Sequence, residues 1–308
     1  MKLTDAQKVD IGLAPAEGIY LYVSSADYFK WPYLSKSALT AFCISPAQHR
    51  AVVDEIIKWK SSDALLLGDA TDVLWFYGLK AYLAGFAEEP AKPPLKKNGK
   101  PYSNYLTSSA GKAWIAQQEI SGKKVLSKAL WIKARAMAAR LDEHKGRDGH
   151  PSARELRDQG IAQVSLVWRC PHTKIWLKGR PDIVDFERRV LTDLKTARDV
   201  RRWGFAKAIS EYDYHWQARL YLQALAILTG TDPLDWIAKY IAVRNEPIHS
   251  VQIYTLSTAA LEQAEREVST KLVEYLHCAM ADNWCGRWPA ETGYEETIDL
   301  AAWRRKNA

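Results

Sequence analysis

The stretch GRPDIVDFERRVLTDLKT, residues 179–196, decides the fold of this chain. Its apolar residues belong to two strand-like runs, 175–186 and 190–196, and a short charged turn at 187–189 separates them. Runs rich in β-branched and other apolar residues, bounded by turn residues, are typical of strands. We therefore expect the two runs to pair as an antiparallel hairpin.

Three charged side chains belong to this apolar hairpin. Asp193 and Lys195 share one face, because side chains alternate with period two, and antiparallel pairing brings Asp182 towards them. Neighbouring carboxylates repel one another, and burial adds to the cost of their charge. A hard divalent cation removes that cost, and oxygen ligands suit magnesium. The hairpin therefore predicts a Mg²⁺ site that Mn²⁺ can also fill, with Lys195 beside it to orient water or offset charge.

The elements around the hairpin predict an α/β fold with a central mixed β-sheet flanked by helices. We expect one domain over 1–308, with a mainly helical N-terminal portion at 1–160, a catalytic core at 161–282 and a tail at 283–308. Apolar spacing predicts helices over 34–59 (with a turn at Ser45-Pro46), 63–77, 108–120, 126–143, 205–228 and 258–281, and further strands over 163–169, 236–243 and 250–256. Residues 144–160 are polar and are expected to be a connection.

Composition restricts the class of protein. The net charge of +7 and the pI of about 9.0 favour a polyanionic partner. No apolar run is long enough for a signal peptide or a membrane span, and the four scattered cysteines favour a reducing, cytoplasmic compartment, in bacteria or a phage-infected host. The sequence contains no phosphate-binding glycine loop, so we expect no nucleotide cofactor. We expect no iron–sulfur cluster, because Cys43, Cys278 and Cys285 lack a close C-x-x-C pair.

A family resemblance rests on motifs in several places. The run K-G-R-P-D…L-T-D-L-K-T, followed by Tyr214-His215-x-Gln217-x-x-x-Tyr221, resembles the RecE (exodeoxyribonuclease VIII) branch of the PD-(D/E)XK nucleases. Upstream, Leu34-Ser35-Lys36-Ser37-x-Leu39 and Ser45-Pro46-Ala47 are similar to its N-terminal helix motif. The resemblance covers most of residues 33–230. It implies a restriction-endonuclease-like PD-(D/E)XK core.

The resemblance also implies roles for individual residues. Asp182, Asp193 and the main-chain carbonyl of Leu194 would bind Mg²⁺, and Lys195 would be the catalytic lysine. Gln217 and Tyr221, which share a helix face, would brace the site and contact DNA, although simple helix packing also explains them.

Two positions depart from the family pattern. Asp72 stands where the family has a metal-binding His, and an aspartate oxygen also suits magnesium. Gln163 stands where the family tends to have Glu.

Further polar residues are candidates for contacts with DNA. Side chains near the hairpin could form a rim that contacts phosphates, or a solvated charged loop. Two serines at a helix start could bind a terminal 5′-phosphate, since helix N-termini attract anions, or could simply cap the helix. These candidates are Ser35, Ser37, Lys178, Arg180, Arg198, Arg201 and Arg202.

The resemblance implies a 5′–3′ exodeoxyribonuclease that resects linear double-stranded DNA ends, releases 5′-mononucleotides and leaves a 3′ single strand for annealing. It also implies a ring-shaped homo-oligomer (a trimer or tetramer) and a RecT-like annealing partner. Two alternatives stay open. One is a RecB-like or CRISPR-associated single-strand nuclease or an endonuclease, and the other is a DNA-binding protein that has lost catalysis.

Overall fold

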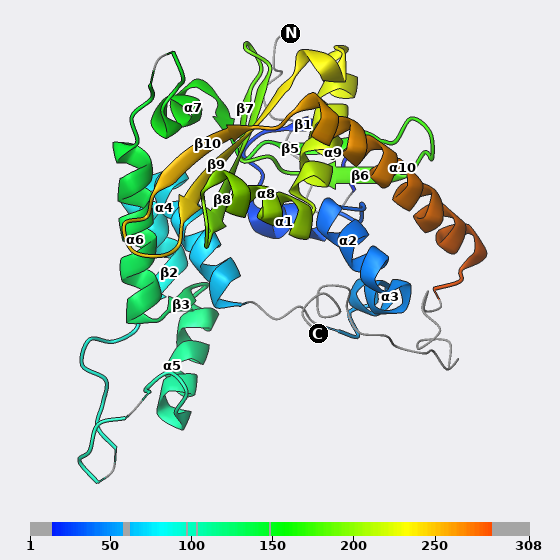
Figure 1. The fold of residues 1–308 in the computed structure, drawn as a ribbon. Helices are drawn as coiled ribbons and strands as arrows, with labels where there is room; N and C mark the ends of the chain where they lie inside the picture. Colours follow the sequence, from blue (N-terminus) through cyan, green and yellow to red (C-terminus); the bar gives the residue numbers. More distant parts are fainter. Residues whose placement is uncertain (1–13, 58–61, 97, 103, 148, 285–308) are drawn as a thin grey trace, which may run out of the picture.

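The computed structural model describes residues 14–57, 62–96, 98–102, 104–147 and 149–284. Its centre is a five-stranded sheet with strand order β10-β9-β8-β7-β4 (Figure 1). β8 and β9 are parallel, and the other neighbours are antiparallel, so the sheet is mixed. The expected α/β fold with a mixed sheet is confirmed. The strands are β4 (Ile161–Ala162), β7 (Ile183–Asp185), β8 (Val190–Ala197), β9 (Ile237–Arg244) and β10 (Val251–Thr255).

The hairpin forms as β7 and β8, but the strand expected over 175–186 is two strands in different sheets. Its first half is β6 (Trp176–Gly179), which pairs with β5 (Ser165–Arg169) in a three-stranded sheet that β1 (Gly18–Tyr20) completes. The chain leaves one sheet and enters the other at Arg180-Pro181-Asp182. Proline has no N–H to donate to a ladder, so Pro181 is a natural place for this break.

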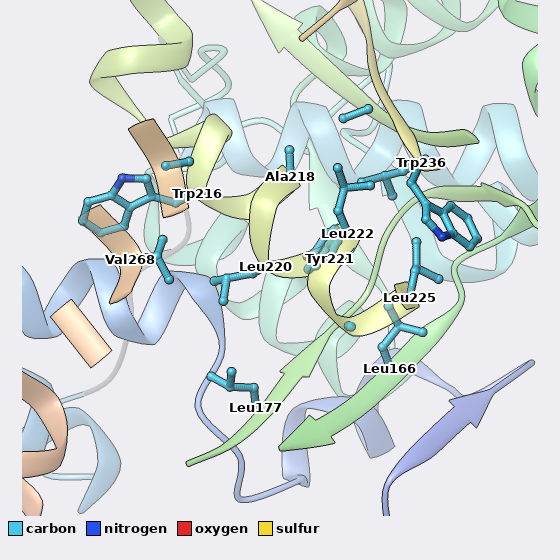
Figure 2. Packing of buried hydrophobic residues seen from close by; sticks show 14 of the residues in the cluster. Leu166, Leu177, Trp216, Ala218, Leu220, Tyr221, Leu222, Leu225, Trp236 and Val268 are labelled. Carbon is cyan, nitrogen blue, oxygen red and sulfur yellow. The ribbon is translucent and has the colours of Figure 1, made fainter. Parts of the chain in front are cut away.

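Helices cover both faces of the central sheet. α4 (Asp63–Gly85) and α6 (Lys128–Glu143) pack on one face through a cluster that includes Leu67, Met137, Leu194 and Ile241. α9 (Tyr214–Thr229) and α10 (Thr258–Ala281) belong to the other cluster, with Leu191, Tyr240 and Ala242 of the sheet. Figure 2 shows how Leu220, Tyr221 and Leu225 of α9 lie over Leu166 and Leu177 of β5 and β6.

The connection between the parallel strands β8 and β9 contains two helices. A single helix was expected over 205–228, but the chain forms α8 (Arg202–Glu211) and α9, with Asp213 between them in the left-handed region at φ 50°. The reorientation at Asp213 lets α9 lie across the sheet, with Gln217 and Tyr221 on the side that faces β8 and β6.

The described part of the N-terminal portion is mainly helical. The structure corrects the expected connection at 144–160, because α7 begins there with a capping box between Ser152 and Glu155.

Among the described helices none is long and apolar enough to cross a bilayer. Most of the expected tail, from residue 285, lies outside the described residues. The remaining elements are α1 (Ser25–Lys30), α2 (Lys36–Ile44), α3 (Pro46–Val53), β2 (Phe86–Glu88), α5 (Ser109–Ile120), β3 (Lys124–Leu126), α7 (Ala153–Gln159) and the 3₁₀ turn η1 (Pro233–Asp235).

Candidate active site

The hairpin places Asp182 beside the second half of β8. Ile183 pairs with Thr192, so the same register, continued by one residue, sets Asp182 opposite Asp193. Backbone pairing between the two strands stops there. The next backbone N–H on β8, that of Leu194, donates instead to the Asp182 side chain, at 2.8 Å from Oδ2. The hairpin therefore brings the two carboxylates together, as the sequence predicts.

Gln163 holds Asp182 from the other side. Its Nε2 donates to Asp182 Oδ1 at 2.8 Å, and its backbone N–H donates to the Asp182 carbonyl at the same distance. Both carboxylate oxygens of Asp182 are therefore hydrogen-bonded. Gln163 is thus a positioning residue for Asp182.

Lys195 connects Asp193 to α9. Its Nζ is 2.5 Å from Asp193 Oδ2 and donates to Gln217 Oε1 at 2.9 Å. Gln217 in turn donates through Nε2 to Asp193 Oδ1 and to the Tyr221 hydroxyl, each at 3.2 Å. The Tyr221 ring packs directly on Gly179, where a Cβ would lie 2.5 Å from it. The one amide of Gln217 therefore connects three of the predicted site residues.

The third carboxylate comes from α4. Burial, and then the charges of Asp182 and Asp193, raise the pKa of Asp72 well above its ordinary value. Burial and Asp193 likewise raise the pKa of Asp182 to about 7. Burial opposes the charge of Lys195, but Asp193 and Asp182 outweigh it and raise the pKa of that ammonium. The structure therefore brings Asp72 into electrostatic contact with the carboxylates of the hairpin.

A gap at the edge of β8 explains why residues from both faces of the sheet can meet. β7 pairs with β8 only as far as Thr192, so the edge of β8 from Asp193 onwards has no strand on the β7 side. The N–H and C=O of one strand residue point to the same edge. Because the Leu194 N–H reaches Asp182, its carbonyl oxygen faces the same gap.

The donor set fits a hard divalent cation in its chemistry, because it consists of carboxylate and carbonyl oxygens. Asp193 Oδ2 is buried and accepts no hydrogen bond of normal geometry from any described group, although the Lys195 ammonium lies beside it. In the described part of the chain, no three acidic, histidine or cysteine side chains already stand at coordinating positions. A cation would therefore bind Asp193 through Oδ2, the oxygen beside which the Lys195 ammonium now lies.

Comparisons with known proteins agree with this geometry. The family model for a PDDEXK-like domain of unknown function (DUF3799) matches residues 35–297, which is most of the chain. The chain belongs to this PDDEXK-like family. The predicted membership of the PD-(D/E)XK superfamily is therefore confirmed, and it supports a nuclease. No curated protein sequence matches the chain.

Solved structures extend the comparison to the fold of the PDDEXK-like domain. The crystal structure of a putative exonuclease from Eubacterium rectale superposes with a TM-score of 0.58 at 12% identity, covering 94% of this chain and 99% of the other. At that identity the likeness shows the fold alone. A second structure, SSO0001, has a TM-score of 0.24 at 12% identity, covers 44% of this chain and 56% of its own, and supports no argument.

Sequence reasoning gave no role to two further residues of the PDDEXK-like domain. The Tyr214 ring lies 4.5 Å from Lys195 Nζ, at cation–π distance. Lys36, at the start of α2, interacts electrostatically with Lys195 and Asp193, and its Nζ donates to the Tyr212 carbonyl at 2.5 Å. Burial lowers the pKa of Lys36 to about 8. The motif runs that carry the resemblance contain both residues, but motif spacing does not indicate their contacts.

The structure corrects the expectation that Lys178 contacts phosphate. Lys178 is 7% exposed, and its ammonium donates to the carbonyls of Tyr28, Phe29 and Trp31 at 3.1, 3.2 and 2.7 Å. It therefore fastens the end of α1 to β6. Arg180 is also partly engaged, because one guanidinium nitrogen donates to the Val23 carbonyl at 2.6 Å.

The remaining DNA-binding candidates lie at the surface or at a helix start. Arg198, Arg201 and Arg202 are exposed after β8, and Arg201 forms an ion pair with Asp199 at 2.7 Å. Ser35 caps α2, with its hydroxyl accepting from the Ala38 N–H at 3.3 Å, while Ser37 is exposed. Ordinary capping therefore accounts for Ser35 here.

Proposed function

We propose that this chain is a Mg²⁺-dependent deoxyribonuclease whose site is formed by Asp72, Asp182, Asp193 and Lys195. One observation carries the proposal: at the open edge of β8, Asp182 and Asp193 of the hairpin lie beside the partly buried Lys195 ammonium, and Asp72 of α4 interacts electrostatically with all three. Such a cluster is costly for a fold that uses it only for packing.

The residues divide into those that hold the ion and those that act on the DNA. Asp72, Asp182, Asp193 and the Leu194 carbonyl would hold Mg²⁺, with Mn²⁺ as a substitute. The bound ion supplies positive charge that polarises a phosphodiester and makes water a better nucleophile. Asp182 is already oriented by Gln163 and the Leu194 N–H.

Lys195 is proposed as the group that meets the reacting phosphate. A metal bound to Asp193 would neutralise the carboxylate charge that Lys195 now neutralises. The Gln217 side chain would still accept a hydrogen bond from the Lys195 ammonium. Lys195 can then donate to a phosphate oxygen or orient water. Gln217 and Tyr221 are positioning residues in this scheme, because they act through Asp193 and Lys195.

We further propose a RecE-like mode of action: resection of linear duplexes from 5′ ends, with mononucleotides and a 3′ single strand as products. The resemblance of the motifs around Asp182, Asp193 and Gln217 supports this mode, and a fold neighbour described as a putative exonuclease is consistent with an exonuclease. A ring-shaped homo-oligomer, a RecT-like annealing partner and a cytoplasmic location belong to the same proposal.

The test uses linear duplex DNA labelled at the 5′ end, with and without Mg²⁺. We expect label to be released as a mononucleotide only when the metal is present. Asp193→Asn and Lys195→Ala should each reduce the rate by at least about 100-fold while the circular dichroism spectrum stays unchanged. Digestion by both variants at the wild-type rate would contradict the site.

The same assay separates the alternatives. Cutting of circular DNA, or of single strands but not duplexes, indicates an endonuclease or a RecB-like or CRISPR-associated single-strand nuclease. Tight DNA binding without cleavage in either Mg²⁺ or Mn²⁺ indicates a binding protein that has lost catalysis.

A further inference from the structure

Positive charge is concentrated in one segment of the chain. Residues 86–128 contain eight lysines and three glutamates, with no arginine or aspartate. This segment therefore carries +5 of the chain's net charge of +7. A field of one sign on a short segment is a feature of surfaces that attract polyanions.

The segment is built as an arm, by which we mean residues 86–128. Figure 1 shows α5 and the loop before it extending away from the central sheet and from the helices that cover it. The base is firm, because β2 and β3 pair in parallel, with Phe86 opposite Lys124, and Phe86 and Leu126 are buried in the cluster beneath α4 and α6. The loop is held close to α5 as well, since a Cβ on Gly111 would lie 1.9 Å from the Tyr105 carbonyl oxygen.

The base of the arm is joined to the helix that carries Asp72. Lys124 of β3 forms an ion pair with Asp69 of α4 at 2.5 Å. Asp69 and Asp72 are three residues apart on one helix, so they lie on neighbouring positions of the same face. The base of the arm therefore contacts α4 about one helical turn from Asp72.

Four lysines of the arm are available to a partner. Lys92, Lys96, Lys100 and Lys112 are exposed, and in the described part of the chain none of them forms an ion pair. Lys96 Nζ lies 5.6 Å from the Tyr102 ring, which leaves its charge accessible. Lysine is a point charge that suits phosphate contacts and carries no base-specific geometry.

We propose that the arm grips the phosphate backbone of duplex DNA beside the active site, without reading its sequence. This inference rests on the proposed function, because it takes the substrate of that site to be DNA. The 12 residues of α5 span roughly 18 Å at the usual helical rise. At about 3.4 Å per phosphate along a strand, the length of α5 matches about five base pairs of duplex.

The experiment compares Lys92→Gln/Lys96→Gln/Lys112→Gln with Lys30→Gln/Lys145→Gln/Lys174→Gln, three exposed lysines outside the arm. Affinity for a fluorescent 30-base-pair duplex is measured in EDTA over a range of salt concentrations. Hydrolysis of thymidine 5′-(p-nitrophenyl phosphate), which is too small to reach the arm, is measured separately in Mg²⁺. Thermal melting verifies that both variants fold.

The arm variant should bind duplex about tenfold or more weakly near 0.1 M salt, and the slope of log affinity against log salt should fall by about one for each lysine that touches a phosphate. The control variant should bind as wild type does, and both should hydrolyse the small ester at the wild-type rate. Unchanged binding by the arm variant, or an equal loss in the control, overturns the proposal, as does loss of ester hydrolysis in the arm variant. Because binding is measured in EDTA, a wild-type protein that cleaves nothing contradicts the proposed function and leaves the binding result to decide the role of the arm.

Discussion

At the scale of single residues, the site depends on how one ammonium and three carboxylates interact at the open edge of β8. Gln217 reconciles them, because an amide offers an acceptor to Lys195 and a donor to Asp193. A carboxylate at this position would add a further charge, and an apolar group would remove one hydrogen bond from each partner. The amide therefore orients charge without adding any.

Gln217→Leu should lower both activity and stability. Lys195 and Asp193 each lose a partner, so we expect cleavage to fall roughly 10–100-fold and the free energy of unfolding to fall by about 1–3 kcal/mol. The matched control is Gln223→Leu on the same helix, where the side chain accepts from Trp168 Nε1 at 3.3 Å. That variant should lose stability and keep its rate in the labelled-duplex assay. Equal rates for the two variants would rule out a positioning role for Gln217.

Asp72→Asn should change the metal requirement more than the fold. The amide keeps the shape of the side chain but removes a charged oxygen ligand, so the Mg²⁺ concentration for half-maximal cleavage should rise about tenfold or more. A Mg²⁺ titration of the cleavage rate measures this shift, and Asp69→Asn, three residues earlier on α4, serves as the control. A titration curve that matches wild type would show that Asp72 binds no metal.

At the scale of elements, α4 contributes both to the site and to the packing at the base of the arm. Its helical geometry is interrupted between the two segments that do so. Gly78 has φ 78° and ψ −178°, which lies outside the helical region, although the flanking segments are helical. The first segment carries Asp72, and the second carries Tyr82, which stacks on Phe86 of β2 at 5.4 Å. The change in direction therefore lets one helix contribute to the site and also pack against the arm.

Gly78→Ala tests this break. Backbone at that φ and ψ is accessible almost only to glycine, and nothing lies within 4 Å of an added Cβ, so any effect is one of backbone strain. We expect the free energy of unfolding to fall by about 1–3 kcal/mol in chemical denaturation. Gly85→Ala, at the end of the same helix and equally open, should be neutral or stabilising by up to about 1 kcal/mol. A Gly78 variant as stable as the Gly85 variant would contradict this account.

At the scale of the whole molecule, the N-terminal helices are tied to the core sheets by a few long-range polar contacts. Lys178 of β6 binds three carbonyls at the end of α1, and its Nζ lies 5.0 Å from the Tyr28 ring. A buried charge is tolerated only when such partners satisfy it. Lys178 is therefore part of the framework that holds the N-terminal segment against the three-stranded sheet.

Lys178→Met should be strongly destabilising, because three carbonyls lose their common donor. We expect a loss of roughly 2–4 kcal/mol in the free energy of unfolding, measured by denaturant titration. Lys174→Met, at the exposed turn between β5 and β6, should change it by less than about 0.5 kcal/mol. If the two variants were equally stable and only Lys178→Met bound DNA more weakly, the expectation that Lys178 contacts phosphate would be correct.

The sequence by itself determined the hairpin, the mixed sheet and the shared face of Asp193 and Lys195. These features follow from periodicity within a few consecutive residues, which a strand imposes wherever it packs. It also placed Asp72, Gln217 and Tyr221 as candidates through the family motifs.

Only the tertiary structure decided which side chains actually meet. It brought Asp72 into electrostatic interaction with the hairpin carboxylates, placed Gln163 against Asp182, broke the expected strand at Pro181 and buried Lys178 at the end of α1. Each of these depends on elements far apart in the chain packing together, and the free energy of that packing comes from the whole core and not from any local pattern.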